Sequence, residues 1–199
     1  MTESTIEPFL RNAWYLGAWP EELADGGPLG RTIMNEPIIF FRGPDGKAAA
    51  LEDRCCHRGA PLSHGQVVEK GIECGYHGLV YDGSGKCVKI PGHDKIPPQA
   101  RVRSYPVVER QQFIWIWMGD AARADESQLI DFPYLDDHQN WPHKKGMFQI
   151  KANYMMLVDN LMDLTHLAYV HAKTIGGNRQ AHSGAVFDAW ETDTGAHYL

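Results

Sequence analysis

Short apolar runs separated by turn residues characterise the first part of the chain. Residues 38–41 are uniformly apolar, and a Gly-Pro-Asp-Gly turn separates them from a second apolar run at residues 48–51. Residues 80–81 and 87–90 flank the sequence Asp-Gly-Ser-Gly, in which Asp-Gly favours the positive φ of a tight turn. The pattern predicts two β-hairpins.

A change of pattern after residue 119 predicts a domain boundary. Residues 113–118 are aromatic or β-branched almost throughout, which is typical of a strand. Several short strands with turns between them indicate a small all-β domain over residues 8–119. The following stretch, residues 120–146, contains an alanine-rich segment and scattered prolines, and we expect it to be a linker to a second unit.

The second unit, residues 147–199, is predicted to mix helix and strand. A helix is expected over residues 154–171, because Leu157, Leu161 and Leu164 recur at helical spacing. Short strands are expected near residues 146–152 and 185–190. The fold class is therefore α+β, with an all-β domain first and the start of an α+β domain after it.

Composition and charge exclude several classes of function. The 199 residues carry a net charge of −6, so no basic stripe is available to neutralise nucleic-acid phosphates. No apolar run approaches the roughly 20 residues that span a bilayer, so no membrane association is expected. The start of the chain is polar and acidic, unlike a signal peptide. We expect a cytoplasmic protein.

The four cysteines indicate metal binding. Cys55, Cys56, Cys74 and Cys87 lie in one part of the chain, and clustered cysteines in a cytosolic protein bind metal more often than they form disulfides. The adjacent pair Cys55-Cys56 would also be awkward in a disulfide framework. Metal ligation is therefore the leading interpretation of these cysteines.

Two Cys/His pairs predict a Rieske-type [2Fe–2S] cluster. Cys55-x-His57 lies in one glycine-containing loop and Cys74-x-x-His77 in another. A Rieske centre takes two thiolates on one iron and two imidazoles on the other, and one Cys and one His from each loop supply that division. Structural zinc also uses two cysteines and two histidines, but usually pairs Cys with Cys and His with His.

The other two cysteines are interpreted as packing residues. In an extended loop, residues two apart point the same way and the residue between them points opposite. Cys55 and His57 are then expected to face the cluster while Cys56 faces away as a small hydrophobe. Cys87, in the second predicted hairpin, receives the same interpretation.

A second group of residues is typical of a mononuclear iron site. His166 and His171 are candidate ligands, and Asp163 lies one helical turn before His166, where its carboxylate could accept the second ring N–H and orient the imidazole. Two imidazoles and a carboxylate form the facial triad of non-haem Fe(II) oxygenases. On an ideal helix, residues five apart lie about 140° apart, so a shared metal requires the helix to distort or end between the two histidines.

Taken together, the motifs resemble those of the oxygenase component of Rieske non-haem iron aromatic-ring oxygenases. The order C-x-H-R-G, C-x-Y-H-G and N-x-x-D-x-x-H-x-x-x-x-H occurs in that family. The sequence Asn-Ala-Trp-Tyr at residues 12–15, Leu79, and Asp-Asn-Leu-Met-Asp at residues 159–163 are similar to the vanillate O-demethylase and dicamba monooxygenase branch. The resemblance implies a Rieske domain followed by a helix-grip catalytic domain.

The resemblance also implies roles for matching residues. Cys55, His57, Cys74 and His77 would hold the cluster, and His166 and His171 would hold Fe(II). Asp163 would link His166 to the cluster ligand His77 of a neighbouring subunit in a head-to-tail homotrimer, and Asn160 would lie near the iron. Electrons from NAD(P)H would arrive through a separate reductase with flavin and/or ferredoxin centres. The reaction would be O₂-dependent hydroxylation or O-demethylation of an aromatic compound.

Two departures from the family pattern bear on these expectations. Cys56 stands where proline is common. Relatives take their third iron ligand from an aspartate far beyond the histidine pair, and Asp188, Glu191 and Asp193 do not match that position. We therefore expect a C-terminally truncated fragment that is inactive alone. The alternative is an electron-transfer protein in which only the Rieske domain functions.

Overall fold

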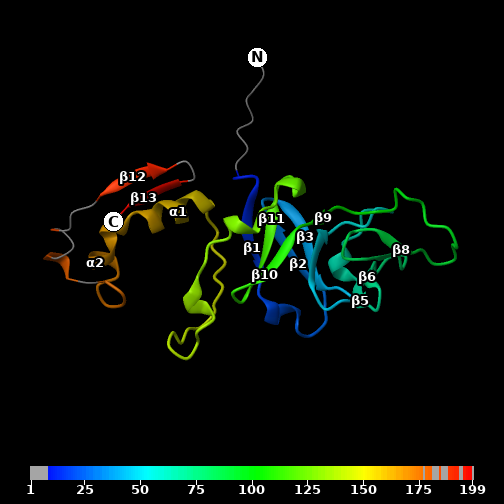
Figure 1. Ribbon diagram of the computed structural model, residues 1–199, viewed down its shortest axis with the longest axis horizontal. Coiled ribbons are helices and arrows are strands. Elements are labelled where there is room, and N and C mark those ends of the chain that lie inside the picture. Colours follow the sequence, from blue (N-terminus) through cyan, green and yellow to red (C-terminus); the bar gives the residue numbers. More distant parts are fainter. Residues whose placement is uncertain (1–8, 177, 181–183, 185–187, 193–194, 199) are drawn as a thin grey trace, which may run out of the picture. The chain divides into compact units, whose positions relative to one another are not determined.

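The fold divides the chain into two units, Met1–Lys144 and Lys145–Leu199. The computed structural model describes residues 9–176, 178–180, 184, 188–192 and 195–198 (Figure 1). The boundary falls near the end of the expected linker, which contains three short 3₁₀ helices at Ala121–Arg123, Glu126–Gln128 and Pro133–Leu135. The domain limits expected from sequence stay predictions.

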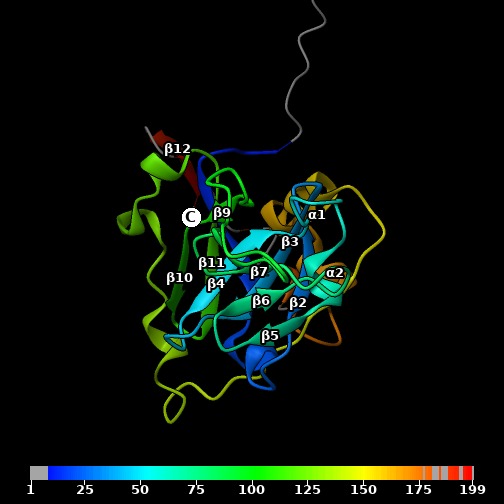
Figure 2. The ribbon, with the colours of Figure 1, turned by 90° about the vertical axis from the view of Figure 1, so that its right-hand side faces the viewer.

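Three antiparallel sheets make up the part of the first unit that the structure describes. The first has the order β1-β11-β10, with bounds Ala13–Ala18, Phe113–Met118 and Val107–Arg110. The second has the order β2-β3-β4-β9, with bounds Leu29–Ile33, Glu36–Arg42, Ala48–Glu52 and Ser104–Tyr105. The third has the order β5-β6-β7-β8, with bounds Gln66–Val68, Gly71–Glu73, Val80–Tyr81 and Cys87–Lys89. Figure 2 shows β5, β6 and β7 side by side.

The predicted strands and hairpins of this unit are confirmed. Strands β3 and β4 pair in register from Ile38 opposite Glu52 to Arg42 opposite Ala48. Strands β7 and β8 form the second predicted hairpin, and β11 covers the predicted run 113–118. The all-β prediction therefore holds, and β1 adds a strand that pairs with β11 and joins the two ends of the domain.

Strand β3 separates two hydrophobic cores. Ile39 and Phe41 belong to the core that contains the thiols of Cys55 and Cys74, whereas Ile38 and Phe40 belong to the core formed with β11. This division follows from the two-residue period of a strand, which directs alternate side chains to opposite faces. Full burial of each such side chain contributes roughly 1.5–3 kcal/mol, so the strand carrying the hydrophobic run also anchors the cysteine-bearing loops.

A polar network around Glu36 ties the start of the chain to the second sheet. The Glu36 carboxylate accepts hydrogen bonds from Arg11, from Arg103 at 3.0 Å and from the Tyr105 hydroxyl at 2.7 Å. Burial alone raises the pKa of Glu36, but the Arg11 and Tyr105 hydrogen bonds and the Arg103 charge outweigh it, and the net pKa is lower than usual. The ionised carboxylate is therefore the form that the fold stabilises.

Replacing Glu36 by glutamine should lower the free energy of unfolding by about 1–2 kcal/mol at neutral pH, because charge-assisted hydrogen bonds are lost. Because the pKa of Glu36 is lower in the folded state, its carboxylate contributes its full stabilisation above the pKa of an unfolded glutamate, about 4.3. This stabilisation is lost as the pH falls through the pKa of Glu36 in the folded protein. Urea unfolding at pH 7 and in acid measures both effects. The matched control is Glu109→Gln, which alters the more exposed ion pair with Arg42 and should lower the free energy of unfolding by at most about 1 kcal/mol. Equal losses of unfolding free energy in the two variants would contradict the stabilising role of the Glu36 network.

Among the residues that the structure describes, the second unit includes helices α1 and α2 and one β-hairpin. Helix α1 spans Tyr154–Met162, a 3₁₀ turn spans Leu164–His166, and α2 spans Leu167–Val170. Strands β12 (Ala189–Thr192) and β13 (Gly195–Tyr198) pair antiparallel. No helix in the part of the chain that the structure describes is long and apolar enough to cross a membrane.

Three sequence predictions for this unit need correction or restriction. The single helix over residues 154–171 is wrong, because Asp163 adopts extended backbone angles (φ −97°, ψ 93°) and ends α1. The strand at residues 146–152 is also wrong, since the structure has no strand there. The strand near residues 185–190 begins only at Ala189, and residues 185–187 lie outside the described residues.

Candidate metal centres

The first Cys/His loop is a closed turn that connects β4 to the third sheet. The amide N–H of Cys55 donates to the carbonyl of Ala60 at 2.8 Å, and the amide of Gly59 donates back to the carbonyl of Cys55 at 2.9 Å. Gly59 has a φ of +68°, a conformation that glycine adopts without steric cost. The turn therefore fixes the Cys55 backbone while leaving His57 at its tip.

The second loop, between β6 and β7, repeats this construction. The Cys74 amide donates to the carbonyl of Leu79 at 2.8 Å, and the Gly78 amide donates to the carbonyl of Cys74 at 3.0 Å. Gly78 has a φ of +71°. Each loop thus holds a cysteine at its base and a glycine four residues later.

The two loops bring the four predicted ligands together. Cys55 and Cys74 are buried, and burial, together with the neighbouring Cys55 side chain, raises the pKa of the Cys74 thiol. The rings of His57 and His77 are exposed and their centroids lie 4.5 Å apart. This pairing of thiols inside and imidazoles outside fits a cluster with one thiolate-bound iron and one imidazole-bound iron.

Backbone groups around Cys74 also fit an anionic sulfur. Burial is the largest influence on the pKa of the Cys74 thiol and raises it, whereas hydrogen bonds from the backbone of Tyr76 and His77 act in the opposite direction. N–H groups aimed at a sulfur stabilise its thiolate form and tune a cluster that it binds. The second loop therefore supplies both the candidate ligand Cys74 and the backbone hydrogen-bond donors to its sulfur.

Tyr81 is a site residue that the sequence analysis missed. Its hydroxyl lies 3.1 Å from the Sγ atoms of both Cys55 and Cys56, and the side chain is fully buried. Burial and the neighbouring thiols raise the pKa of Tyr81 above its ordinary value, so the hydroxyl stays protonated and can donate to sulfur. Its position in β7 gave no signal in the sequence, because it reads as one more apolar strand residue.

The packing interpretation of the remaining cysteines is half correct. Cys87 is fully buried in the core with Leu51 and Tyr81, as predicted. Cys56 is exposed, and its sulfur shares the Tyr81 hydroxyl with Cys55. The prediction for Cys56 assumed an extended loop, whereas the loop is a turn, so the two-residue alternation does not apply to it.

The second candidate site brings His166 and His171 together. Their ring centroids lie 5.3 Å apart, because the chain changes from a 3₁₀ turn to α2 at His166 and α2 ends before His171. Nδ1 of His166 lies 2.6 Å from the backbone carbonyl oxygen of Asp163. A carbonyl only accepts, so Nδ1 carries the proton and Nε2 is left as the ligand atom.

Within a single chain, Asp163 makes different hydrogen bonds from the one that the sequence predicted. Its carboxylate accepts from the backbone N–H and the hydroxyl of Thr165 and so caps the 3₁₀ turn, while its carbonyl rather than its carboxylate contacts His166. Asn160 lies on α1 and is exposed. The assignment of these four residues to an iron site stays a prediction.

No three His, Cys, Asp or Glu side chains converge on a single point among the residues that the structure describes. At the first site the four candidate ligands, two thiols and two imidazoles, would divide two and two between the irons of a dinuclear cluster. For the second site it means that His166 and His171 are the pair present, without a third ligand from the described residues.

Comparison with known proteins identifies the class of protein. Residues 13–106 match the family model of the Rieske [2Fe-2S] domain, and residues 150–198 match that of the vanillate O-demethylase oxygenase C-terminal domain. The all-β cysteine- and histidine-bearing unit is therefore a Rieske domain, and both the predicted cluster and the α+β fold class are confirmed. The chain belongs to the Rieske non-haem iron oxygenases, in the branch of the vanillate O-demethylase and dicamba monooxygenase oxygenase components.

Individual relatives support the same branch. The iron-sulfur subunit of the toluene-4-sulfonate monooxygenase system of Comamonas testosteroni is 46% identical over 94% of this chain and 54% of its own length. The oxygenase component of dicamba O-demethylase of Stenotrophomonas maltophilia is 51% identical over 82% of this chain and 48% of its own length. The crystal structure of dicamba monooxygenase with non-heme iron and dicamba matches 83% of this chain and 49% of that chain, with a TM-score of 0.72 and 45% identity. The chain spans about half the length of these relatives.

Proposed function

We propose that this chain forms part of the oxygenase component of a Rieske non-haem iron monooxygenase. The reaction is O₂-dependent hydroxylation or O-demethylation of an aromatic compound, with electrons delivered from NAD(P)H by a separate reductase. The observation that carries the proposal is the presence, in one chain, of both the paired Cys/His loops and the His166/His171 pair. An electron carrier would need only the first of these.

The residues divide the work between two sites. Cys55 and Cys74, which are buried, would hold one iron of the cluster from inside the domain, and the exposed His57 and His77 would hold the other at the surface. His166 and His171 would hold Fe(II), and the hydrogen bond of His166 Nδ1 to the Asp163 carbonyl leaves Nε2 as the ligand atom of His166. When bound, the cluster supplies single electrons and the mononuclear iron supplies the site for O₂ activation.

The proposed assembly is a head-to-tail homotrimer in the cytoplasm. The exposed ring of His77 is available to a neighbouring subunit, and Asp163 would connect it to the neighbour's His166 by a hydrogen-bonded path. Asn160 would lie beside the same iron. A ring of this kind is a heterologous interface that closes at a fixed rotation.

The runner-up function is that of an electron carrier that uses the Rieske domain alone. It is favoured by one observation, that the described residues bring only two candidate ligands to the second site. Such a protein would bind the cluster but hold no iron at His166 and His171.

Iron counting distinguishes the two functions. Chain loaded anaerobically with excess Fe(II) and then desalted should contain more iron than labile sulfide, and the double variant His166→Ala/His171→Ala should contain equal amounts of the two. His138→Ala/His143→Ala is the matched control, because these histidines also lie in ring contact, with centroids 5.0 Å apart, and it should keep the excess iron. No excess iron in the unaltered chain would favour the carrier.

Removing the Tyr81 hydroxyl tests the environment of the cluster. Tyr81→Phe should lower the reduction potential by tens of millivolts, because a hydrogen bond to a ligand sulfur stabilises the more negative reduced state, and about 1.4 kcal/mol corresponds to 59 mV for one electron. A redox titration followed by EPR measures the shift. Tyr76→Phe, which alters a tyrosine in the other loop, should leave the potential close to that of the unaltered chain, and an unchanged potential in Tyr81→Phe would contradict this role.

A further inference from the structure

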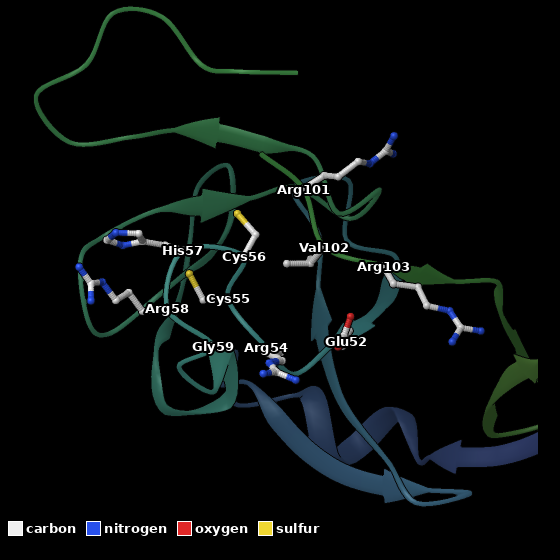
Figure 3. Close-up of a pocket in the computed structure, with 10 residues that line it drawn as sticks. All are labelled: Glu52, Arg54, Cys55, Cys56, His57, Arg58, Gly59, Arg101, Val102 and Arg103. Atoms are coloured by element: carbon white, nitrogen blue, oxygen red, sulfur yellow. The ribbon is translucent and has the colours of Figure 1, made fainter. Parts of the chain in front are cut away.

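Among the residues that the structure describes, three pairs of histidine rings lie in contact, and one pair belongs to neither candidate metal centre. The first pair contains His57, which Figure 3 shows on the loop that carries Cys55, and the second is the candidate iron pair. The third consists of His138 and His143, whose ring centroids lie 5.0 Å apart. We call it the linker histidine pair, because it follows the 3₁₀ helix Pro133–Leu135 in the expected linker.

A closed turn holds the linker histidine pair in place. The carbonyl of Asp137 accepts a hydrogen bond from the amide of Trp141 at 2.8 Å. The carboxylate of Asp137 accepts from the backbone and side-chain N–H groups of Asn140 at 3.1 and 2.7 Å. The Trp141 ring also packs edge-on against Tyr134, with centroids 4.7 Å apart, and Pro142 restricts the backbone after it. The turn therefore fixes the backbone between the two histidines.

The ring of His143 is oriented by the backbone in the way that metal-binding histidines usually are. Its Nδ1 lies 2.9 Å from the carbonyl oxygen of Trp141. A carbonyl only accepts, so Nδ1 carries the proton and Nε2 keeps its lone pair for a metal ion. His166 has the same arrangement with the carbonyl of Asp163, so the linker pair repeats a feature of the candidate iron pair.

The spacing of the two rings fits two imidazoles on one metal ion. With metal–nitrogen bonds of about 2.0–2.1 Å and a ring centroid about 1.1 Å beyond each nitrogen, bonds at right angles place the centroids about 4.5 Å apart and tetrahedral bonds about 5.2 Å apart. The observed 5.0 Å lies between these values. Imidazole ligands suit zinc and copper, whereas calcium and magnesium take oxygen ligands.

The surroundings of the pair leave coordination as the source of affinity. Two aspartates, Asp136 and Asp137, precede the pair, and Lys144 and Lys145 follow it, so the formal charges next to it in sequence balance. No third His, Cys, Asp or Glu side chain converges with the pair in the part of the chain that the structure describes. Water then fills the other positions on the metal ion, and an ion held by two protein ligands exchanges with solution.

We propose that His138 and His143 form a preformed, exchangeable binding site for a divalent transition-metal ion of the zinc and copper type. The ion accepts a lone pair from one ring nitrogen of each histidine, and with zinc no electron is transferred. It links the two ends of the turn and so restrains the segment that follows the Rieske domain in sequence. The site uses none of the candidate ligands of the two iron centres, and the proposal does not depend on the function proposed above.

Equilibrium dialysis against Zn²⁺ tests this assignment, since Zn²⁺ stands above Fe²⁺ in the general order of metal affinity. The cluster-loaded variant His166→Ala/His171→Ala is the background, because it lacks the candidate iron pair, and it should bind about one Zn²⁺ per chain. Adding His138→Ala, or His143→Ala in a separate variant, should weaken Zn²⁺ binding at least about 10-fold. The matched control His93→Ala removes an exposed histidine that is in none of the ring pairs, and it should keep the zinc.

A further variant tests whether the turn preforms the site. Asn140→Ala removes the side-chain hydrogen bond to Asp137 and leaves both imidazoles in place. It should weaken Zn²⁺ binding several-fold, less than the loss of either histidine. Unchanged affinity in Asn140→Ala would contradict the preformed geometry. Millimolar Mg²⁺ should not displace the zinc, because two imidazoles do not suit this ion.

Equal Zn²⁺ affinity in the His138→Ala and His93→Ala variants would overturn the proposal, and so would the absence of bound zinc in the background variant at submillimolar free Zn²⁺. Iron and labile sulfide are measured after dialysis in each sample. Zinc that enters only as iron and sulfide are lost would also overturn the proposal, because it would then occupy the cysteine ligands of the cluster.

Discussion

Serine in place of Cys55 or Cys74 is expected to abolish cluster binding, with iron and labile sulfide falling from about two each per chain to near zero. Both thiols are buried at the bases of the two loops, and a serine hydroxyl is a poor substitute for a thiolate on iron. Anaerobic purification followed by iron and sulfide analysis measures the loss. Circular dichroism confirms that each variant is folded.

The neighbouring cysteine provides the matched control. Cys56→Ser changes the same atom type one residue away and should keep the full content of iron and sulfide, because the four ligands are present without it. Cys56 is exposed, so the substitution should leave stability nearly unchanged. Loss of the cluster in Cys56→Ser, or retention in Cys55→Ser, would contradict the assignment of ligands in the first loop.

Alanine at Phe40 or Phe41 is expected to lower the free energy of unfolding by about 3–5 kcal/mol, a large part of the stability of a typical domain. Both rings are fully buried on β3, so each substitution leaves a cavity of similar size. Urea unfolding of the two variants measures this loss.

The two variants should differ in cluster content. Phe41 packs in the core with Cys55 and Cys74, so its cavity lies on the side of the ligands and should reduce cluster loading. Phe40 packs in the other core with Ile114 and Ile116 and should leave loading unchanged in protein that is still folded. Equal losses of sulfide from both variants would show that the two cores do not act independently.

The strands that the sequence predicted are those whose residues have a strong preference for β-structure and are also buried. The runs that became β3 and β11 are β-branched and aromatic, and such residues suit a pleated, buried surface. The strands β5 and β6 were missed because each has only three residues and contains polar or glycine positions. Their pairing depends on contacts between distant parts of the chain, which a local pattern does not encode.

The first metal centre was predictable because ligand identity and spacing constrain it more than backbone conformation does. Cys55, His57, Cys74 and His77 were assigned from spacing, and the structure brings the two histidine rings to 4.5 Å. The contribution of Tyr81 was not predictable, because it depends on the packing of β7 against the first Cys/His loop.

The second site shows where helical periodicity fails. Leucine spacing predicted a continuous helix, but Asp163 ends α1 and caps the next turn through Thr165. Aspartate competes with helix by accepting local backbone hydrogen bonds, and here that competition decides the geometry. The break is what allows the rings of His166 and His171 to come together, so the departure from the simplest helical pattern lies at the candidate iron ligands.

The reduction potential of the iron-loaded chain tests the central claim most directly. A cluster held by two cysteines and two histidines should have a potential between about −150 and +300 mV, because imidazoles replace two anionic thiolates. A redox titration followed by EPR of the anaerobically purified chain gives this value. A potential near −400 mV would indicate all-cysteine ligation, and zinc in place of iron and sulfide would exclude redox function altogether; either result would contradict the account.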